Sequence, residues 1–167
     1  GGAEQRLRVP TARFHGFYDL LPAEVFKGFL SAPVARILGK HLFDHERLIR
    51  AREAMVLGVQ VFNSPAMRFK SEVFAMLVNV AWTYLLHEYY ERKNVKIAGK
   101  DGRSLLLSQI IDRQDCPLSK GIKDNLKALK ILRDDVEHKL LGRADAKWLG
   151  LFQACCLNFD KAICDLF

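Results

Sequence analysis

The stretch that decides the fold is residues 68–92, RFKSEVFAMLVNVAWTYLLHEYYER. Its apolar side chains recur at the three- and four-residue spacing of an α-helix. The spacing predicts one helix of about seven turns, whose wide apolar stripe packs against the rest of the protein. The predicted stripe consists of Phe69, Val73, Leu77, Val80, Ala81 and Tyr84.

Proline and glycine residues divide the rest of the chain into further helices. Pro22 and Pro33 each favour the first position of a short helix, and Pro117 precedes a long one. The pair Asp101-Gly102 favours a tight turn, which predicts a short β-hairpin-like insertion over 94–107. The other predicted helices span residues 22–30, 33–43, 44–62, 118–141 and 144–167. The sequence therefore predicts an all-α bundle of four to five long helices with one short insertion.

The chain of 167 residues has the length of one domain with an appendage. We expect a helical domain over 46–167, with Leu48, Met55, Val59 and Phe62 in its core. Residues 1–45 carry more aromatic side chains than a tail needs, which predicts an N-terminal helical extension that packs on the bundle. These aromatic residues are Phe14, Phe17, Tyr18, Phe26 and Phe29.

The composition is that of a basic globular protein. The 26 basic and 19 acidic residues give a net charge of +7, and the isoelectric point near 9.4 suits a polyanion such as nucleic acid or simply a basic protein. No apolar run approaches a membrane span, and from the first residues we expect no signal peptide. The cysteines lack metal-ligand spacing and are expected to be reduced, most of them in the core, so we expect a cytoplasmic protein.

One group of residues on the helix predicted at 118–141 contains side chains that could transfer protons and bind a phosphate. Arg133 and His138 are separated by four residues, and Asp134 follows the arginine. Asp134 precedes His138 by one helical turn, so its carboxylate can fix the imidazole tautomer and raise its pKa. The planar fork of Arg133 suits a phosphate. The alternative is an arginine paired with aspartate on a solvated face, beside a surface histidine.

Lysines line the same helix at three- and four-residue spacing. Lys120, Lys123, Lys127 and Lys130 precede the motif and are either a solvated face or a track for RNA phosphates that leads to His138. We expect Lys123, Lys127 and Lys130 to bind RNA. A second pair with the motif's spacing, Arg36 and His41, has the apolar Ile37 after its arginine.

The segment LKALKILRDDVEH at 126–138 resembles the motif helix of the HEPN superfamily, in which an arginine, a polar residue and a histidine recur with four to six residues between the arginine and the histidine. Arg133, Asp134 and His138 match that motif, although asparagine more often follows the arginine. Leu140 stands where one variant of the motif has tyrosine. Segments over roughly 47–141 are also similar to a bacterial HEPN-like family known only as a domain of unknown function.

The resemblance implies a homodimer in which two motif helices form one cleft. Such a cleft would cut RNA without metal or cofactor, through attack by the 2′-hydroxyl, in a stress or phage-defence system with a protein regulator or antitoxin. By the resemblance, Arg133, Asp134 and His138 would be the catalytic residues.

Two other classes of function stay open. One is a non-catalytic HEPN-like helical module for dimerisation or for binding a partner or nucleic acid, and the weaker one is a helical DNA-binding domain. Motifs of NTPases, dinucleotide-binding domains, zinc proteases and serine hydrolases do not occur in the sequence. We therefore expect no metal site and no cofactor.

Overall fold

The computed structural model describes residues 46–99, 102–138 and 145–167, with backbone alone for residues 133–138 and 145–147. Its helices are α3 (Glu46–Asn63), α4 (Lys70–Arg92), α5 (Leu107–Ile111), α6 (Lys120–His138) and α7 (Asp145–Leu166). The predicted all-α class is confirmed for this part of the chain. The predicted extension over 1–45, with its helices at 22–30 and 33–43, lies outside the described residues.

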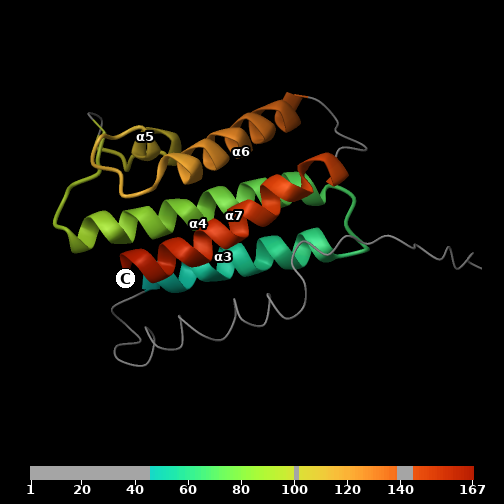
Figure 1. The fold of residues 1–167 in the computed structure, drawn as a ribbon, viewed down its shortest axis with the longest axis horizontal. Coiled ribbons are helices and arrows are strands. Elements are labelled where there is room, and N and C mark those ends of the chain that lie inside the picture. The colour runs from blue at the N-terminus through green and yellow to red at the C-terminus, as the bar shows by residue number, and fades with distance from the viewer. Residues whose placement is uncertain (1–45, 100–101, 139–144) are drawn as a thin grey trace, which may run out of the picture.

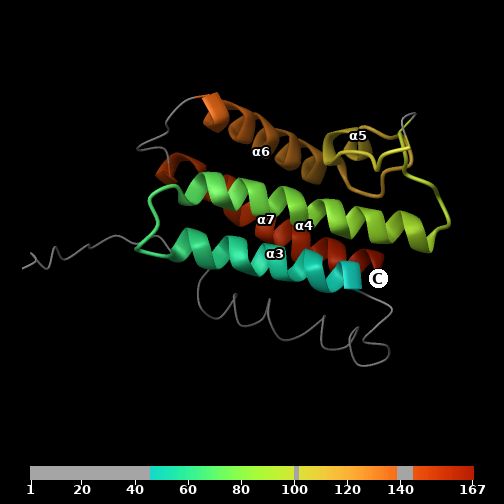
Figure 2. The same ribbon diagram turned by 180° about the vertical axis from the view of Figure 1, so that it is seen from behind.

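Helix α4 is the centre of the bundle, because it contacts all four of the other described helices. It runs antiparallel to α3, with α7 lying across both and α6 on its opposite side (Figures 1 and 2). Trp82, at the middle of α4, is fully buried, and its indole Nε1–H donates to Cys155 Sγ on α7 at 3.3 Å. The stretch at 68–92 therefore organises the fold as its sequence predicts.

The face of α4 that forms the core differs from the predicted stripe. Phe69 and Val80 are 58% and 41% exposed, and of the six predicted residues only Ala81 is fully buried. The physical reason is that α4 is apolar on most of its circumference, so two faces compete for burial. The larger side chains of α4 form the core, where Phe74 meets Phe62 of α3 and Phe152 of α7. The large buried apolar residues of α4 are Phe74, Val78, Trp82, Leu85, Leu86 and Tyr90.

Three phenylalanine rings join α3, α4 and α7. The ring of Phe152 lies 5.3 Å from that of Phe62 and 4.7 Å from that of Phe74, measured between centroids. The Phe62–Phe152 pair has the edge-on arrangement that aromatic rings favour, and the Phe74–Phe152 pair is tilted by 47°. Burial of the core positions predicted for α3, which are Leu48, Met55, Val59 and Phe62, is confirmed.

The cysteines agree with the expectation of reduced residues, since all of them are free. Cys116, Cys155 and Cys156 are buried, whereas Cys164 is exposed. Burial raises the pKa of the Cys155 thiol to about 12, so this cysteine is a neutral core residue at physiological pH.

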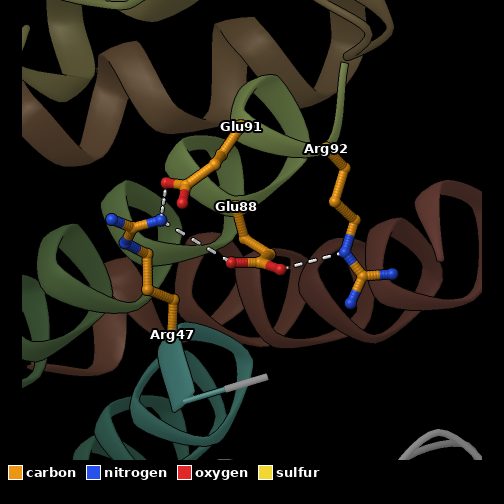
Figure 3. A network of polar contacts seen from close by, with 4 residues as sticks. All are labelled: Arg47, Glu88, Glu91 and Arg92. Carbon is orange, nitrogen blue, oxygen red and sulfur yellow. Dashed lines mark hydrogen bonds and ion pairs between the residues drawn. The ribbon is translucent and has the colours of Figure 1, made fainter. Parts of the chain in front are cut away.

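A network of charges ties α3 to the end of α4 (Figure 3). The Glu88 side chain is only 10% exposed and accepts a 2.9 Å hydrogen bond from Arg92 Nε. Arg47, near the start of α3, forms ion pairs with Glu88 and Glu91. The Arg92 guanidinium also lies 4.8 Å from the centroid of the Phe167 ring, so the C-terminal residue is held at the same place.

Helix α4 ends in a Schellman motif. Asn94 adopts a φ of 55°, in the left-handed region that asparagine tolerates. The Asn94 N–H donates to the Glu91 carbonyl, and the Val95 N–H donates to the Tyr90 carbonyl, both at 2.9 Å. These bonds satisfy carbonyls at the end of the helix and turn the chain toward α5.

The predicted hairpin-like insertion is not formed by strands in the described part of 94–107. The segment has one isolated antiparallel bridge, between Ala98 and Ser104. Gly102, in the predicted turn, has a φ of 75°. The apolar run that ends at Leu107 begins the short helix α5 instead, where the Gln109 side chain accepts a 2.8 Å hydrogen bond from the Leu106 N–H.

The loop between α5 and α6 is held against α4 by Tyr90. The Tyr90 hydroxyl donates to Asp115 Oδ1 at 3.1 Å, and Arg113 holds both carboxylate oxygens of Asp115 at 2.7 Å. Burial raises the pKa of Tyr90 to about 12. The folded protein therefore favours the neutral phenol.

We expect Tyr90→Phe to lower the free energy of unfolding by about 1 kcal/mol at pH 7, because it removes one hydrogen bond. Because Tyr90 ionises less readily in the folded protein, its neutral phenol stabilises the wild type. This contribution is fully present below pH 10 and is lost as the pH rises toward 12. The stability gap between the two proteins should therefore narrow from pH 10 to pH 12 in urea melts. Tyr89→Phe is the control at pH 7, and a gap that does not change above pH 10 would contradict the prediction.

Candidate functional site

The predicted motif lies in the last turns of α6. The backbone of Arg133, Asp134 and His138 is helical, as predicted, and the side chains of these three residues lie outside the described ones. Ile122, Leu126, Leu129 and Leu132 are buried, which fixes the helix face that packs on the bundle. With about 100° per residue, position 138 stands opposite Leu129, whereas position 133 stands near the buried face.

The lysines predicted to bind RNA gather around one carboxylate, that of Asp112. Lys127 Nζ lies 2.7 Å from Asp112 Oδ1. The hydrogen bond from Lys127, and then the charges of Lys127, Lys123 and Lys130, hold the pKa of Asp112 below its usual value. Asp112 follows α5 directly, so the chain reversal between α5 and α6 places an anion against this basic face.

The basic face is thus partly neutralised by the protein itself. Lys127 pairs with Asp112, and the neighbouring Lys120 pairs with Asp124 at 2.6 Å. Lys123 is half-buried and Lys130 is exposed. The sequence spacing placed Lys123, Lys127 and Lys130 together, but it gave no sign of Asp112, which comes from a different helix.

A groove of about 570 Å³ lies between α4, residues 104–111 and α6. Its volume falls in the range typical of small-molecule sites. Apolar side chains from all three elements form part of its lining, and Lys130 is the cation at its α6 side. We call this feature the α4–α6 groove.

Polar groups from α4 and from residues 104–111 also line the α4–α6 groove. His87 Nε2 lies 3.1 Å from the carbonyl oxygen of Leu105, which only accepts hydrogen bonds. Nε2 therefore carries a proton and donates to this carbonyl. The hydroxyls of Ser104 and Ser108 lie in the same lining, as does Thr83, whose hydroxyl donates to the Asn79 carbonyl at 2.6 Å.

The groove and the motif are adjacent along α6. Leu129 and Lys130 both line the groove. Viewed down the axis of α6, position 133 lies between the directions of Leu129 and Lys130. Arg133 also stands three residues beyond Lys130, about 4.5 Å further along the axis. The motif thus begins one turn beyond the groove.

The groove residues His87, Ser104 and Ser108 do not belong to any motif of the sequence. They come from different elements, and the contact between His87 and Leu105 joins residues 18 positions apart. One signal was present in the sequence, namely that α4 has more apolar surface than one packing face requires.

Neither a metal centre nor a membrane span was found in the part of the chain that the structure describes. The residues within 46–99, 102–138 and 145–167 contain no group of three histidine, cysteine, aspartate or glutamate side chains that could hold a metal ion. Among the same residues, each helix is too short or too polar to cross a lipid bilayer.

Comparison with known families gives one match. The model of the family described as Domain of unknown function (DUF3644) matches residues 46–167. The chain belongs to this family. The match begins where α3 begins and includes every described helix.

Searches of curated proteins and of solved structures found no match to the chain. The DUF3644 description names no activity, so the function has to be argued from the residues.

We expect Lys127→Met to raise the pKa of Asp112 toward its usual value of 3.8, because the hydrogen bond from Lys127 is the largest cause of the lowering. Ionised Asp112 stabilises the fold at neutral pH, and this contribution disappears as the pH falls through its folded-state pKa. NMR titration of the Asp112 carboxyl resonance measures the change. Lys120→Met, which removes the pair with Asp124 instead, should leave the Asp112 titration in place.

Proposed function

We propose that this protein is a metal-independent, cytoplasmic endoribonuclease of HEPN type that acts as a homodimer. The observation that carries the proposal is the order of groups along α6. A basic face and a groove lead directly to the positions of Arg133, Asp134 and His138. This order matches the needs of RNA cleavage, in which a polyanion is first bound and one phosphate is then activated.

The proposed reaction needs one proton-transfer group and one phosphate clamp. The 2′-oxygen of a ribose attacks the adjacent phosphorus, and the bond from that phosphorus to the 5′-oxygen breaks. The products are a 2′,3′-cyclic phosphate and a 5′-hydroxyl. His138 moves protons near neutral pH, Arg133 binds the phosphate oxygens and Asp134 orients the imidazole. A two-fold dimer supplies a second copy of each group to the same cleft.

RNA would have to compete with Asp112 for the lysines of α6. Asp112 already pairs with Lys127 at 2.7 Å, and the charges of Lys123 and Lys130 also act on this carboxylate. An RNA phosphate would exchange with this carboxylate, so the charge of Asp112 limits non-specific affinity. Such a built-in competitor suits a nuclease that acts in a stress or defence response under the control of a regulator or antitoxin.

The alternative is a non-catalytic helical module that binds a protein partner. Large apolar side chains on α6 and α7 favour it, because Ile131 is 63% exposed and Leu157 is 54% exposed. A partner chain that covered them would remove apolar surface from water. The activity measurements below separate this reading from the nuclease.

We expect His138→Ala to slow RNA cleavage by a factor on the order of 10²–10⁴, because it removes the proton-transfer group. Its effect on stability should be below about 0.5 kcal/mol, since position 138 stands opposite the buried face of α6. Single-turnover cleavage assays and melting curves measure the two effects.

Two further variants sharpen this test. Arg133→Lys should not restore cleavage, since a point charge does not reproduce a bidentate fork on phosphate. Asp134→Asn should be milder, because the amide oxygen still accepts a hydrogen bond from the imidazole. If His138→Ala remains folded and cleaves RNA as fast as the wild type, the nuclease proposal is wrong and the partner-binding module takes its place.

We expect cleavage to persist in EDTA and to leave 2′,3′-cyclic phosphate ends, because the proposed chemistry uses side chains for proton transfer and charge stabilisation. Mass spectrometry of the cleaved RNA identifies the ends, with a magnesium-dependent ribonuclease as the positive control for chelation. Activity that is lost in EDTA and returns with magnesium would refute the mechanism.

A further inference from the structure

We infer that the α4–α6 groove is a nucleobase-binding subsite, which holds the base of a ribonucleotide whose phosphate reaches the motif end of α6. This inference rests on the proposed ribonuclease function and deepens it, because it assigns the part of the RNA that the motif itself does not contact. It is carried by the groove's size, by its mixed lining and by its position beside Lys130.

The apolar part of the lining suits the flat faces of a base. Leu107, Ile111 and Leu129 are buried residues of the groove, and they present hydrocarbon surface from two helices, α5 and α6. The half-buried Tyr84 adds an aromatic side chain from α4. Apolar and aromatic surfaces of this kind bind bases by stacking and contact, with little dependence on sequence.

The polar part of the lining suits the hydrogen-bonding edge of a base. His87 lines the groove, and besides the Nε2 that donates to the Leu105 carbonyl it carries a second ring nitrogen, Nδ1, for hydrogen bonding. The hydroxyls of Ser104 and Ser108 can both donate and accept. Amino, imino and carbonyl groups of a base are complementary to this set.

The position of the cation agrees with a nucleotide. Lys130 lines the groove, and Arg133 stands one turn further along α6. A nucleotide joins an uncharged aromatic base to an anionic phosphate through one sugar. A base in the groove would therefore place its phosphate toward Lys130 and the motif.

A protein segment fits the groove less well than a nucleotide does. The lining includes Asn79, Thr83, His87, Ser104 and Ser108 beside its apolar residues. An apolar helix in the groove would remove these groups from water without replacing their hydrogen bonds, which is unfavourable. A nucleobase satisfies them and still covers the apolar surface.

The experiment is an NMR titration of the full chain with each of the four ribonucleoside 5′-monophosphates and, separately, with the four nucleosides. We expect at least one base to shift the resonances of residues 83–87 and 104–108 saturably. The monophosphate should bind more tightly than its nucleoside, because Lys130 meets the phosphate. Lys130→Met should remove that difference, whereas Lys120→Met should keep it.

A groove-filling variant tests the location. Val80 lines the groove, whereas Met76, one turn earlier on α4, is 58% exposed and lies outside the lining. Val80→Trp should weaken nucleotide binding at least about tenfold, and Met76→Trp should leave it within about twofold, with both proteins folded by circular dichroism. Equal effects of the two tryptophans would overturn the inference, as would the absence of saturable shifts with every nucleotide.

The inference and the nuclease proposal can fail separately. Saturable nucleotide binding that Val80→Trp abolishes, in a protein without cleavage activity, would support the subsite and refute the nuclease. Cleavage of RNA by a wild-type protein that shows no saturable nucleotide shifts at residues 83–87 and 104–108 would refute the subsite alone. If slow hydrogen exchange at residues 80–87 depends on protein concentration and not on nucleotide, the groove is a protein interface and the inference is wrong.

Discussion

The burial of Trp82 is the constraint on which the rest of the structure depends. Its ring is fully enclosed, its N–H donates to Cys155 Sγ, and it packs edge-to-face with Phe159 at a centroid distance of 5.3 Å. Replacing such a buried ring by alanine typically costs about 3–5 kcal/mol. Because residues of α7 enclose Trp82, the chain has to pass back across α4 after it has formed α5 and α6. The position of α6 relative to α4, and with it the α4–α6 groove, is thus a consequence of how α4 is covered.

The connection between α4 and α6 is held in place by short polar contacts. Asn94 turns the chain at the end of α4, and Tyr90 holds Asp115 in the loop that precedes α6. Between these points, the chain passes through residues 104–111, which form one wall of the groove, and through Asp112, which meets the lysines. The same connection therefore positions the groove wall and the counter-ion of the basic face.

Much of the fold could be predicted from local sequence, because helix periodicity and helix boundaries are local properties. The long helices begin and end within a few residues of their predicted positions, and Leu48, Met55, Val59 and Phe62 are core residues as expected. The insertion was harder, since the apolar run ending at Leu107 suits a strand or a helical turn equally well. Of the candidate site, spacing along α6 could predict the lysine cluster. Asp112, His87 and Ser108 could not be predicted, because their roles depend on contacts between helices.

The wrongly predicted stripe of α4 explains why a groove exists at all. Val80 and Tyr84 were expected in the core, yet both line the α4–α6 groove. A central helix with apolar residues on most of its circumference cannot bury every face when its neighbours cover only part of it. The face with Phe74 and Trp82 has the larger side chains, so packing against α3 and α7 takes that face. The face of α4 that carries Val80 and Tyr84 lines the α4–α6 groove instead, together with polar groups of residues 104–111. A central helix whose sequence carries more apolar surface than one packing face needs therefore indicates a binding surface.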